Sequence, residues 1–141
     1  MDAPKDIRDL AELRLAEADF LFTGKFYEGA FYLAGYAVEL CLKAKICECL
    51  GLPDLYVKHI PKTELSKVFM VHNLDRLLLL SGLLTTFETV KLSEPKLMKA
   101  WSCLAVWNEK ARYDKRNSHT DCDIKEFIDS VRLITEWINK H

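Results

Sequence analysis

Glycine is scarce in this chain, and its positions exclude one large class of nucleotide-binding proteins. The sequence contains five glycines, and none of them belongs to a phosphate-binding loop motif. They are Gly24, Gly29, Gly35, Gly51 and Gly82. The glycine-rich loops of P-loop enzymes and of dinucleotide-binding enzymes are therefore excluded.

Metal-binding and disulfide patterns are also lacking. The four histidines are scattered without metal-ligand spacing, and no Glu-x-x-His pair of a di-iron bundle is present. The five cysteines, an odd number, show none of the paired spacings of a zinc site or a disulfide framework. We therefore predict no metal and no cofactor, and we interpret the cysteines as buried free thiols in a reducing compartment.

The chain has neither a strong charge of one sign nor an uninterrupted apolar run. The formal net charge is −1, so any contact with nucleic acid must come from a local basic patch. The most hydrophobic stretch, residues 26–50, contains five charged side chains, which a membrane-spanning helix would not tolerate. The first 14 residues are charged and lack the apolar core of a signal peptide. These features predict a soluble, cytoplasmic protein with no membrane partner.

What the sequence does contain is helical periodicity. Half of the residues are hydrophobic, and no segment alternates as a strand would. A first helix is expected from Pro4 to about Gly24, with an apolar stripe that includes Leu13 and Phe20. A second is expected at residues 26–50; it is apolar on most sides, which is typical of a central helix. Gly29 and Gly35 within it predict close packing against a neighbouring helix.

The second half predicts three more helices. Residues 52–72 form a connection with one helical turn, and a short helix capped by Asn73 stops at Gly82. The next helix starts near Ser93 and continues to about Arg112. The last begins at a capping box made by Asp123 and Glu126. The pattern predicts one all-α domain over residues 1–141, an antiparallel up-and-down bundle of four to five helices.

Residues 109–121, EKARYDKRNSHTD, concentrate the groups that can perform chemistry. If the helix continues, Arg112 and His119 share one face, since they are seven residues apart. A histidine can transfer a proton at neutral pH, and an arginine can hold a phosphate through paired donors. Together they are sufficient for metal-free RNA cleavage. The alternative interpretation is a solvated basic loop between two helices.

Three further stretches resemble elements of the HEPN family (higher eukaryotes and prokaryotes nucleotide-binding). Residues 24–51 resemble its second helix, with Glu39, Leu42, Lys43 and Ala44 at the positions of a Glu-x-x-Leu-Lys-Ala-like core. Residues 72–78, HNLDRLL, resemble a His-Asp-Leu-x-x-Leu element, and residues 107–113, WNEKARY, resemble an Arg-Tyr element. The three occur in the family's order and span most of the chain.

The resemblance implies a helical bundle that forms a homodimer and binds RNA or nucleotide. Many family members are metal-independent ribonucleases, often toxins paired with a nucleotidyltransferase antitoxin. Their signature, an arginine and a histidine separated by four to six residues, is met by Arg112 and His119, which become the candidate catalytic residues. Tyr113 stands where active members usually have a polar residue. The candidate substrate-binding residues are Lys110, Tyr113, Lys115, Arg116 and Asn117.

Two functions remain open from the sequence. One is a domain that binds RNA or nucleotide and cleaves RNA without a metal. The other is a non-catalytic dimerisation or interaction module that binds a partner protein or a nucleotide through the same surface. In family dimers the two signatures meet at the interface, so the catalytic alternative requires a homodimer. The role of the segment at residues 52–71 is not predicted.

Overall fold

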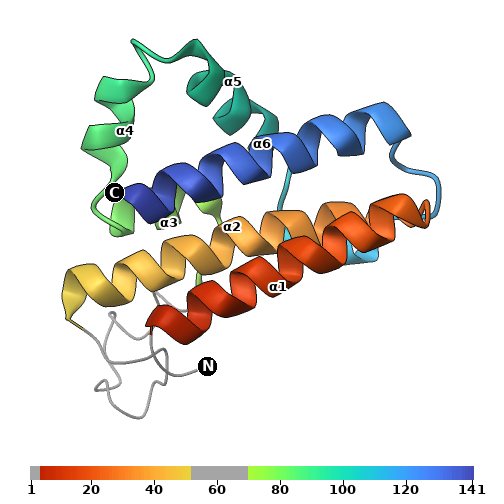
Figure 1. Ribbon diagram of the computed structural model, residues 1–141, viewed down its shortest axis with the longest axis horizontal. Coiled ribbons are helices and arrows are strands. Elements are labelled where there is room, and N and C mark those ends of the chain that lie inside the picture. The colour runs from red at the N-terminus through yellow and green to blue at the C-terminus, as the bar shows by residue number, and fades with distance from the viewer. Residues whose placement is uncertain (1–3, 52–69) are drawn as a thin grey trace.

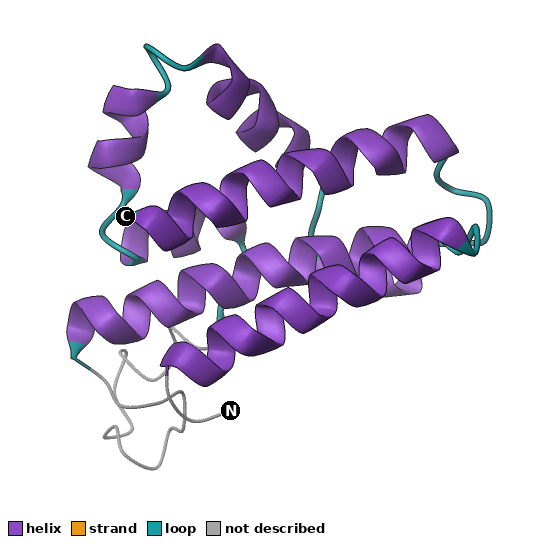
Figure 2. Ribbon diagram, in the orientation of Figure 1, coloured by secondary structure: helices purple, strands orange, loops and turns teal. Residues whose placement is uncertain are grey.

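All regular secondary structure in the described part of the chain is helical. The computed structural model describes residues 4–51 and 70–141, and Figure 2 shows helices joined by short loops. The elements are α1 (Pro4–Thr23), α2 (Tyr27–Leu50), α3 (Leu74–Leu80), α4 (Leu84–Val90), α5 (Pro95–Leu104), the 3₁₀ helix η3 (Glu109–Tyr113) and α6 (Asp121–Lys140). The predicted all-α class is confirmed. Among these residues no helix combines the length and the apolar character that crossing a membrane requires.

Three long helices form the body of the molecule. Figure 1 shows α1 and α2 antiparallel to each other, and α6 beside α2 and running in the same direction as α2. The helix α3 packs against α2, and α4 and α5 form an arm that returns to the body where α5 packs against α6. The ring of Phe87 in α4 contacts those of Trp101 and Trp137, which ties the arm to α6.

The helix α2 is central, as its composition predicts. It packs against α1 on one side and α6 on the other, and most of its residues from Ala30 to Cys47 are buried. Gly35 lets the Trp107 side chain, which follows α5, pack against α2, because a Cβ atom at that position would lie 2.2 Å from Nε1 of Trp107. At its end Gly51 adopts a left-handed conformation with φ 67°, and its N–H bonds back to the last turn.

The apolar stripe predicted for α1 is wrong at two of its positions. Leu13 and Phe20 are 51% and 79% exposed, whereas the buried residues of α1 are Ile7, Ala11 and Ala18. Larger side chains of α1 also pack against the core, and these are Leu10, Leu15, Leu21 and Phe22. The predicted stripe is therefore right at its start, where Ile7 is buried, and wrong further along the helix.

The predicted helix from Ser93 to Arg112 is confirmed in its first half and wrong in its second. The helix α5 begins at Pro95 and ends at Leu104, a separate helix α4 precedes it, and η3 follows after a turn. The break has a packing cause, since the indole of Trp107 is buried against Gly35 and turns the chain back toward α2. The predicted third long helix is thus replaced by α5, a turn and η3.

Helix boundaries elsewhere differ by a few residues. Asn73 caps α3 as predicted, accepting from the N–H of Arg76 at 3.0 Å. The predicted capping box at Asp123 is wrong, because Thr120 is the cap of α6 and its hydroxyl accepts from the N–H of Asp123. The helical turn predicted within residues 52–72 falls at residues 64–69, which lie outside the described residues.

Candidate active site

The segment between α5 and α6 contains two helix caps, Asn108 and Thr120, and one residue in the left-handed conformation, Asn117. The side chain of Asn108 accepts from the N–H of Lys110 at 2.8 Å and begins η3, which packs against α2. After Tyr113 the chain leaves the helical conformation and turns at Asn117, where φ is 66°. Asparagine tolerates this region better than most residues. We call residues 105–120 the site segment.

A carboxylate of α2 holds this turn in place. The N–H of Ser118 donates to Oε1 of Glu28, in the first turn of α2, at 3.1 Å. His119 is the next residue, so this hydrogen bond also positions the backbone of His119 relative to α2. Glu28 and Ser118 are 90 residues apart, and no pattern in the sequence connects them.

The imidazole of His119 is fixed by two contacts. Its Nε2 lies 2.8 Å from Oδ2 of Asp114, and its ring stacks on that of Phe31 with a centroid distance of 4.3 Å. A carboxylate can only accept a hydrogen bond, so Nε2 carries a hydrogen, and in the neutral imidazole Nδ1 is then the nitrogen with the lone pair. The arrangement is that of a general base whose tautomer is set by a neighbouring acid.

This histidine lies in the wall of a cleft of about 580 Å³, within the size range of small-ligand sites. The lining combines polar groups of the site segment with apolar groups of α2 and α6. It is formed by Phe31, Cys103, Val106, Asn108, Lys110, Ala111, Asp114, Ser118, His119, Asp123, Ile124 and Phe127. His119, Asp114 and Lys110 are thereby brought to one cavity, which places a base, its orienting acid and a cation around the same space.

Arg112 is not part of this cleft lining. Its side chain is exposed, and its guanidinium lies 4.9 Å from the centre of the Tyr113 ring. The helical continuity on which the shared face with His119 was based is wrong, because η3 ends at Tyr113. Within one chain the structure therefore does not bring Arg112 and His119 into one cavity.

The other predicted binding residues divide into two groups. Lys110 lines the cleft, whereas Tyr113, Lys115, Arg116 and Asn117 are exposed outside its lining. Arg116 and Lys115 lie in the turn that leads to His119. These cations flank the cleft without entering it.

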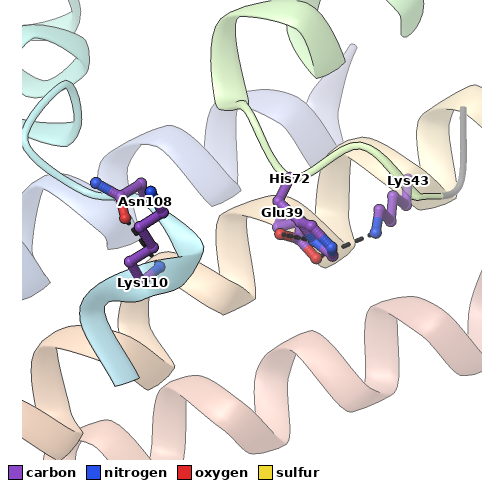
Figure 3. Close-up of polar contacts among 5 residues, drawn as sticks. All are labelled: Glu39, Lys43, His72, Asn108 and Lys110. Atoms are coloured by element: carbon purple, nitrogen blue, oxygen red, sulfur yellow. Dashed lines mark hydrogen bonds and ion pairs between the residues drawn. The ribbon is translucent and has the colours of Figure 1, made fainter. Parts of the chain in front are cut away.

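A second histidine–carboxylate pair lies in the body of the molecule. In Figure 3, His72 and Lys43 both approach the carboxylate of Glu39. Nδ1 of His72 is 3.0 Å from Oε1, and Nζ of Lys43 is 3.1 Å from Oε2. Glu39 and Lys43 are both buried, and none of the three residues lines the cleft. Glu39 and Lys43, one turn apart in α2, therefore form a buried ion pair.

None of the cysteines, all of which lie in the described part of the chain, forms a disulfide, and their predicted burial is only partly right. Cys41 and Cys47 are buried, Cys103 is half-buried in the cleft wall, and Cys49 and Cys122 are exposed. Burial raises the pKa of the Cys41 thiol to about 12. Among the described residues no group of three or more potential ligands is placed to hold a metal ion.

Sequence reasoning missed three residues of this site. Asp114 was visible only as one of several acids in residues 109–121, although its distance of five residues before His119 permits a turn contact. Asn108 was missed because the predicted helix ran through it. Phe31 belongs to α2 and carried no signal, since its stacking on His119 depends on the packing of α2 against the site segment.

Comparisons with known proteins give no further assignment. No protein-family model matches the chain, and searches of curated proteins and of solved structures found no match.

Proposed function

We propose that this chain is a cytoplasmic HEPN-like domain that binds RNA and cleaves it without a metal, in the manner of a toxin controlled by a nucleotidyltransferase-type antitoxin. One observation carries the proposal: the Asp114–His119 pair in the wall of a cleft that also contains Lys110. The sequence resemblance to the HEPN family supports it independently.

The reaction follows from the roles of these groups. Nδ1 of His119 removes the proton of a ribose 2′-hydroxyl, and the 2′-oxygen attacks the adjacent phosphorus. The bond to the 5′-oxygen breaks, and that oxygen takes a proton from water, which leaves a 2′,3′-cyclic phosphate and a 5′-hydroxyl. The imidazolium of His119 then returns its proton to the solvent. The ammonium of Lys110 stabilises the negative charge that accumulates on the phosphoryl oxygens. Asp114 stabilises the protonated imidazole while the proton is held there.

Arg112 has a different role in this proposal. Since it lies outside the cleft of its own chain, it acts in the homodimer that the resemblance implies, where it reaches the phosphate held by the partner's cleft. Lys115 and Arg116 bind flanking phosphates of the RNA. Their contribution is electrostatic and decreases with salt concentration.

The first experiment is RNA cleavage by purified protein in excess chelator, alongside three variants and one control. We expect His119→Ala to reduce the rate by about 10²- to 10⁴-fold. Lys110→Ala removes one charged donor and should cost on the order of 10²-fold. Lys96→Ala removes an exposed lysine of α5 that is not part of the cleft lining, and it should leave the rate unchanged.

The third variant, Arg112→Ala, tests the dimer. If it is inactive alone, mixing it with His119→Ala should restore activity, because one of the two sites in a mixed dimer keeps both residues. Activity of Arg112→Ala at the wild-type level would remove this arginine from the mechanism. RNA that stays intact with wild-type protein would overturn the ribonuclease proposal.

A second candidate is a non-catalytic interaction module, and one observation favours it. The Arg112 side chain lies over Tyr113, which is 73% exposed, so the arginine and the aromatic ring form an external surface separate from the cleft. Such a pair is typical of protein interfaces. Intact RNA together with a stable complex that Tyr113→Ala dissociates would establish this function instead.

A further inference from the structure

We infer that the cleft recognises the base beside the scissile phosphate and prefers guanine. This inference rests on the proposed binding of RNA at the same site and adds the substrate class. It starts from the polar groups of the cleft lining that have no partner among the described residues.

Most polar groups of the lining already make hydrogen bonds. The carboxylate of Asp114 is bonded to His119, and the hydroxyl of Ser118 donates to the carbonyl of Lys115. Asn108 uses its Oδ1 to accept from the N–H of Lys110, which also fixes the orientation of the amide. Its NH₂ group is therefore directed elsewhere, as a donor only.

Asp123 provides the complementary group. Asp123 is an exposed residue at the cleft; its backbone N–H is bonded to Thr120, and its carboxylate makes no hydrogen bond or ion pair with another described residue, so it is open to a ligand. A carboxylate has two oxygens that accept and none that donates. The cleft therefore presents one pair of acceptors at Asp123 and one donor group at Asn108, beside the catalytic groups.

Guanine is the RNA base that best matches this set. Its N1–H and N2–H₂ are adjacent donors that can meet both oxygens of one carboxylate, and its O6 accepts from an amide. Uracil has one donor between two carbonyl oxygens, which the carboxylate would repel. Adenine and cytosine each place an acceptor nitrogen beside their amino group. Proteins read single-stranded RNA through such base edges.

The charged groups of the cleft favour a neutral base over a phosphate as its main occupant. Asp114 and Asp123 give it two carboxylates against the single ammonium of Lys110. The exposed cations Arg112, Lys115 and Arg116 lie outside the lining. Apolar side chains such as Val106 and Phe127 complete the lining and provide the walls that an aromatic base requires. The base enters the cleft while most phosphates remain at its rim.

Binding of four mononucleotides tests the inference without relying on cleavage. We expect GMP to bind the wild-type protein about 10- to 100-fold more tightly than UMP, the discrimination typical of a bidentate base contact. AMP and CMP should bind like UMP. Inosine monophosphate, which lacks the 2-amino group, should lie between GMP and UMP.

Asp123→Asn is the decisive variant, and Asp121→Asn is its matched control. Both remove one negative charge from the first turn of α6, but only Asp123 lines the cleft. We expect Asp123→Asn to lower GMP affinity and to raise UMP affinity, because the carboxylate no longer repels the uracil carbonyl oxygens, so that the preference for GMP is lost. Asp121→Asn should keep the preference. An equal effect of both variants on all four nucleotides would overturn base recognition by Asp123.

Cysteine alkylation locates the bound nucleotide. GMP should protect Cys103, in the cleft wall, and should leave the exposed Cys49 as reactive as before. Binding without protection of Cys103 would place GMP elsewhere and contradict the inference. The two proposals fail separately: RNA cleavage with no preference among bases refutes only the guanine site, whereas guanine-selective binding with intact RNA refutes only the ribonuclease.

Discussion

The two histidine–carboxylate pairs of this molecule have similar contacts and different surroundings. Glu39 is buried in α2 and also binds Lys43, whereas Asp114 belongs to the site segment and is 31% exposed. The first pair joins the segment before α3 to the body, and the second lies in the wall of a cleft. We expect the buried Glu39 to stabilise the fold. Asp114 lies beside the cleft, so its partner His119 remains available to a ligand.

The largest expected contrast between the pairs is in RNA cleavage. His119→Ala should lower the rate by about 10²- to 10⁴-fold, because it removes the proton acceptor of the cleft. His72→Ala should leave the rate within a few-fold of wild type, since His72 does not line the cleft. Rates are measured on one RNA in excess chelator. Equal losses in both variants would show that the two histidines do not have separate roles.

In unfolding experiments we expect the opposite: substitution in the buried Glu39 pair should lower stability more than substitution in the Asp114 pair. Glu39→Gln removes the negative charge from a buried ion pair and should cost about 3 kcal/mol of the free energy of unfolding. Asp114→Asn affects a partly exposed pair and should cost less than about 1 kcal/mol. Urea denaturation of both variants gives the comparison. A destabilisation by Asp114→Asn as large as that by Glu39→Gln would mean that the site pair is also structural.

The site segment depends on the body through Trp107, and Gly35→Ala tests this dependence. The added methyl group would overlap the Trp107 indole, so we expect a loss of about 2 kcal/mol in stability and reduced RNA cleavage. Gly29→Ala is the matched control, because its Cβ would meet only the end of the Leu21 side chain at 3.2 Å. It should remain within about 1 kcal/mol of wild type. Normal cleavage by Gly35→Ala would show that the segment does not need this contact.

A smaller effect should appear in the body at alkaline pH. Burial raises the pKa of the Cys41 thiol from its ordinary value of 9.0 to about 12, so between these values the unfolded chain releases a proton that the folded protein keeps. Stability therefore falls with pH in this window, by about 1 kcal/mol near pH 10. Cys41→Ala should flatten the pH dependence above pH 9, and Cys49→Ala, which changes an exposed thiol, should not. Equal slopes in wild type and Cys41→Ala would contradict the assignment.

The helical body was largely predictable because its signals are local. Gly51 ends α2 and Asn73 caps α3 through contacts within a few residues, and the apolar character of α2 identifies it as central. The prediction failed where packing outweighed hydrophobicity. Leu13 and Phe20 are exposed, whereas Ala11 and Ala18 are buried, because the face that α1 buries depends on the partner helix.

The candidate site was predictable only in part for the same reason. The sequence by itself determined the helical class, the central helix and a polar segment that contains His119, since periodicity, caps and composition act over short distances. Only the tertiary structure decided that Asp114 and Phe31 fix His119, that Lys110 rather than Arg112 lines the cleft, and that Glu28 holds the turn. The contacts of Glu28 and Phe31 join α2 to a segment about 90 residues away, and they depend on the turn by which the chain comes back to α2 after α5, where Trp107 is buried against Gly35.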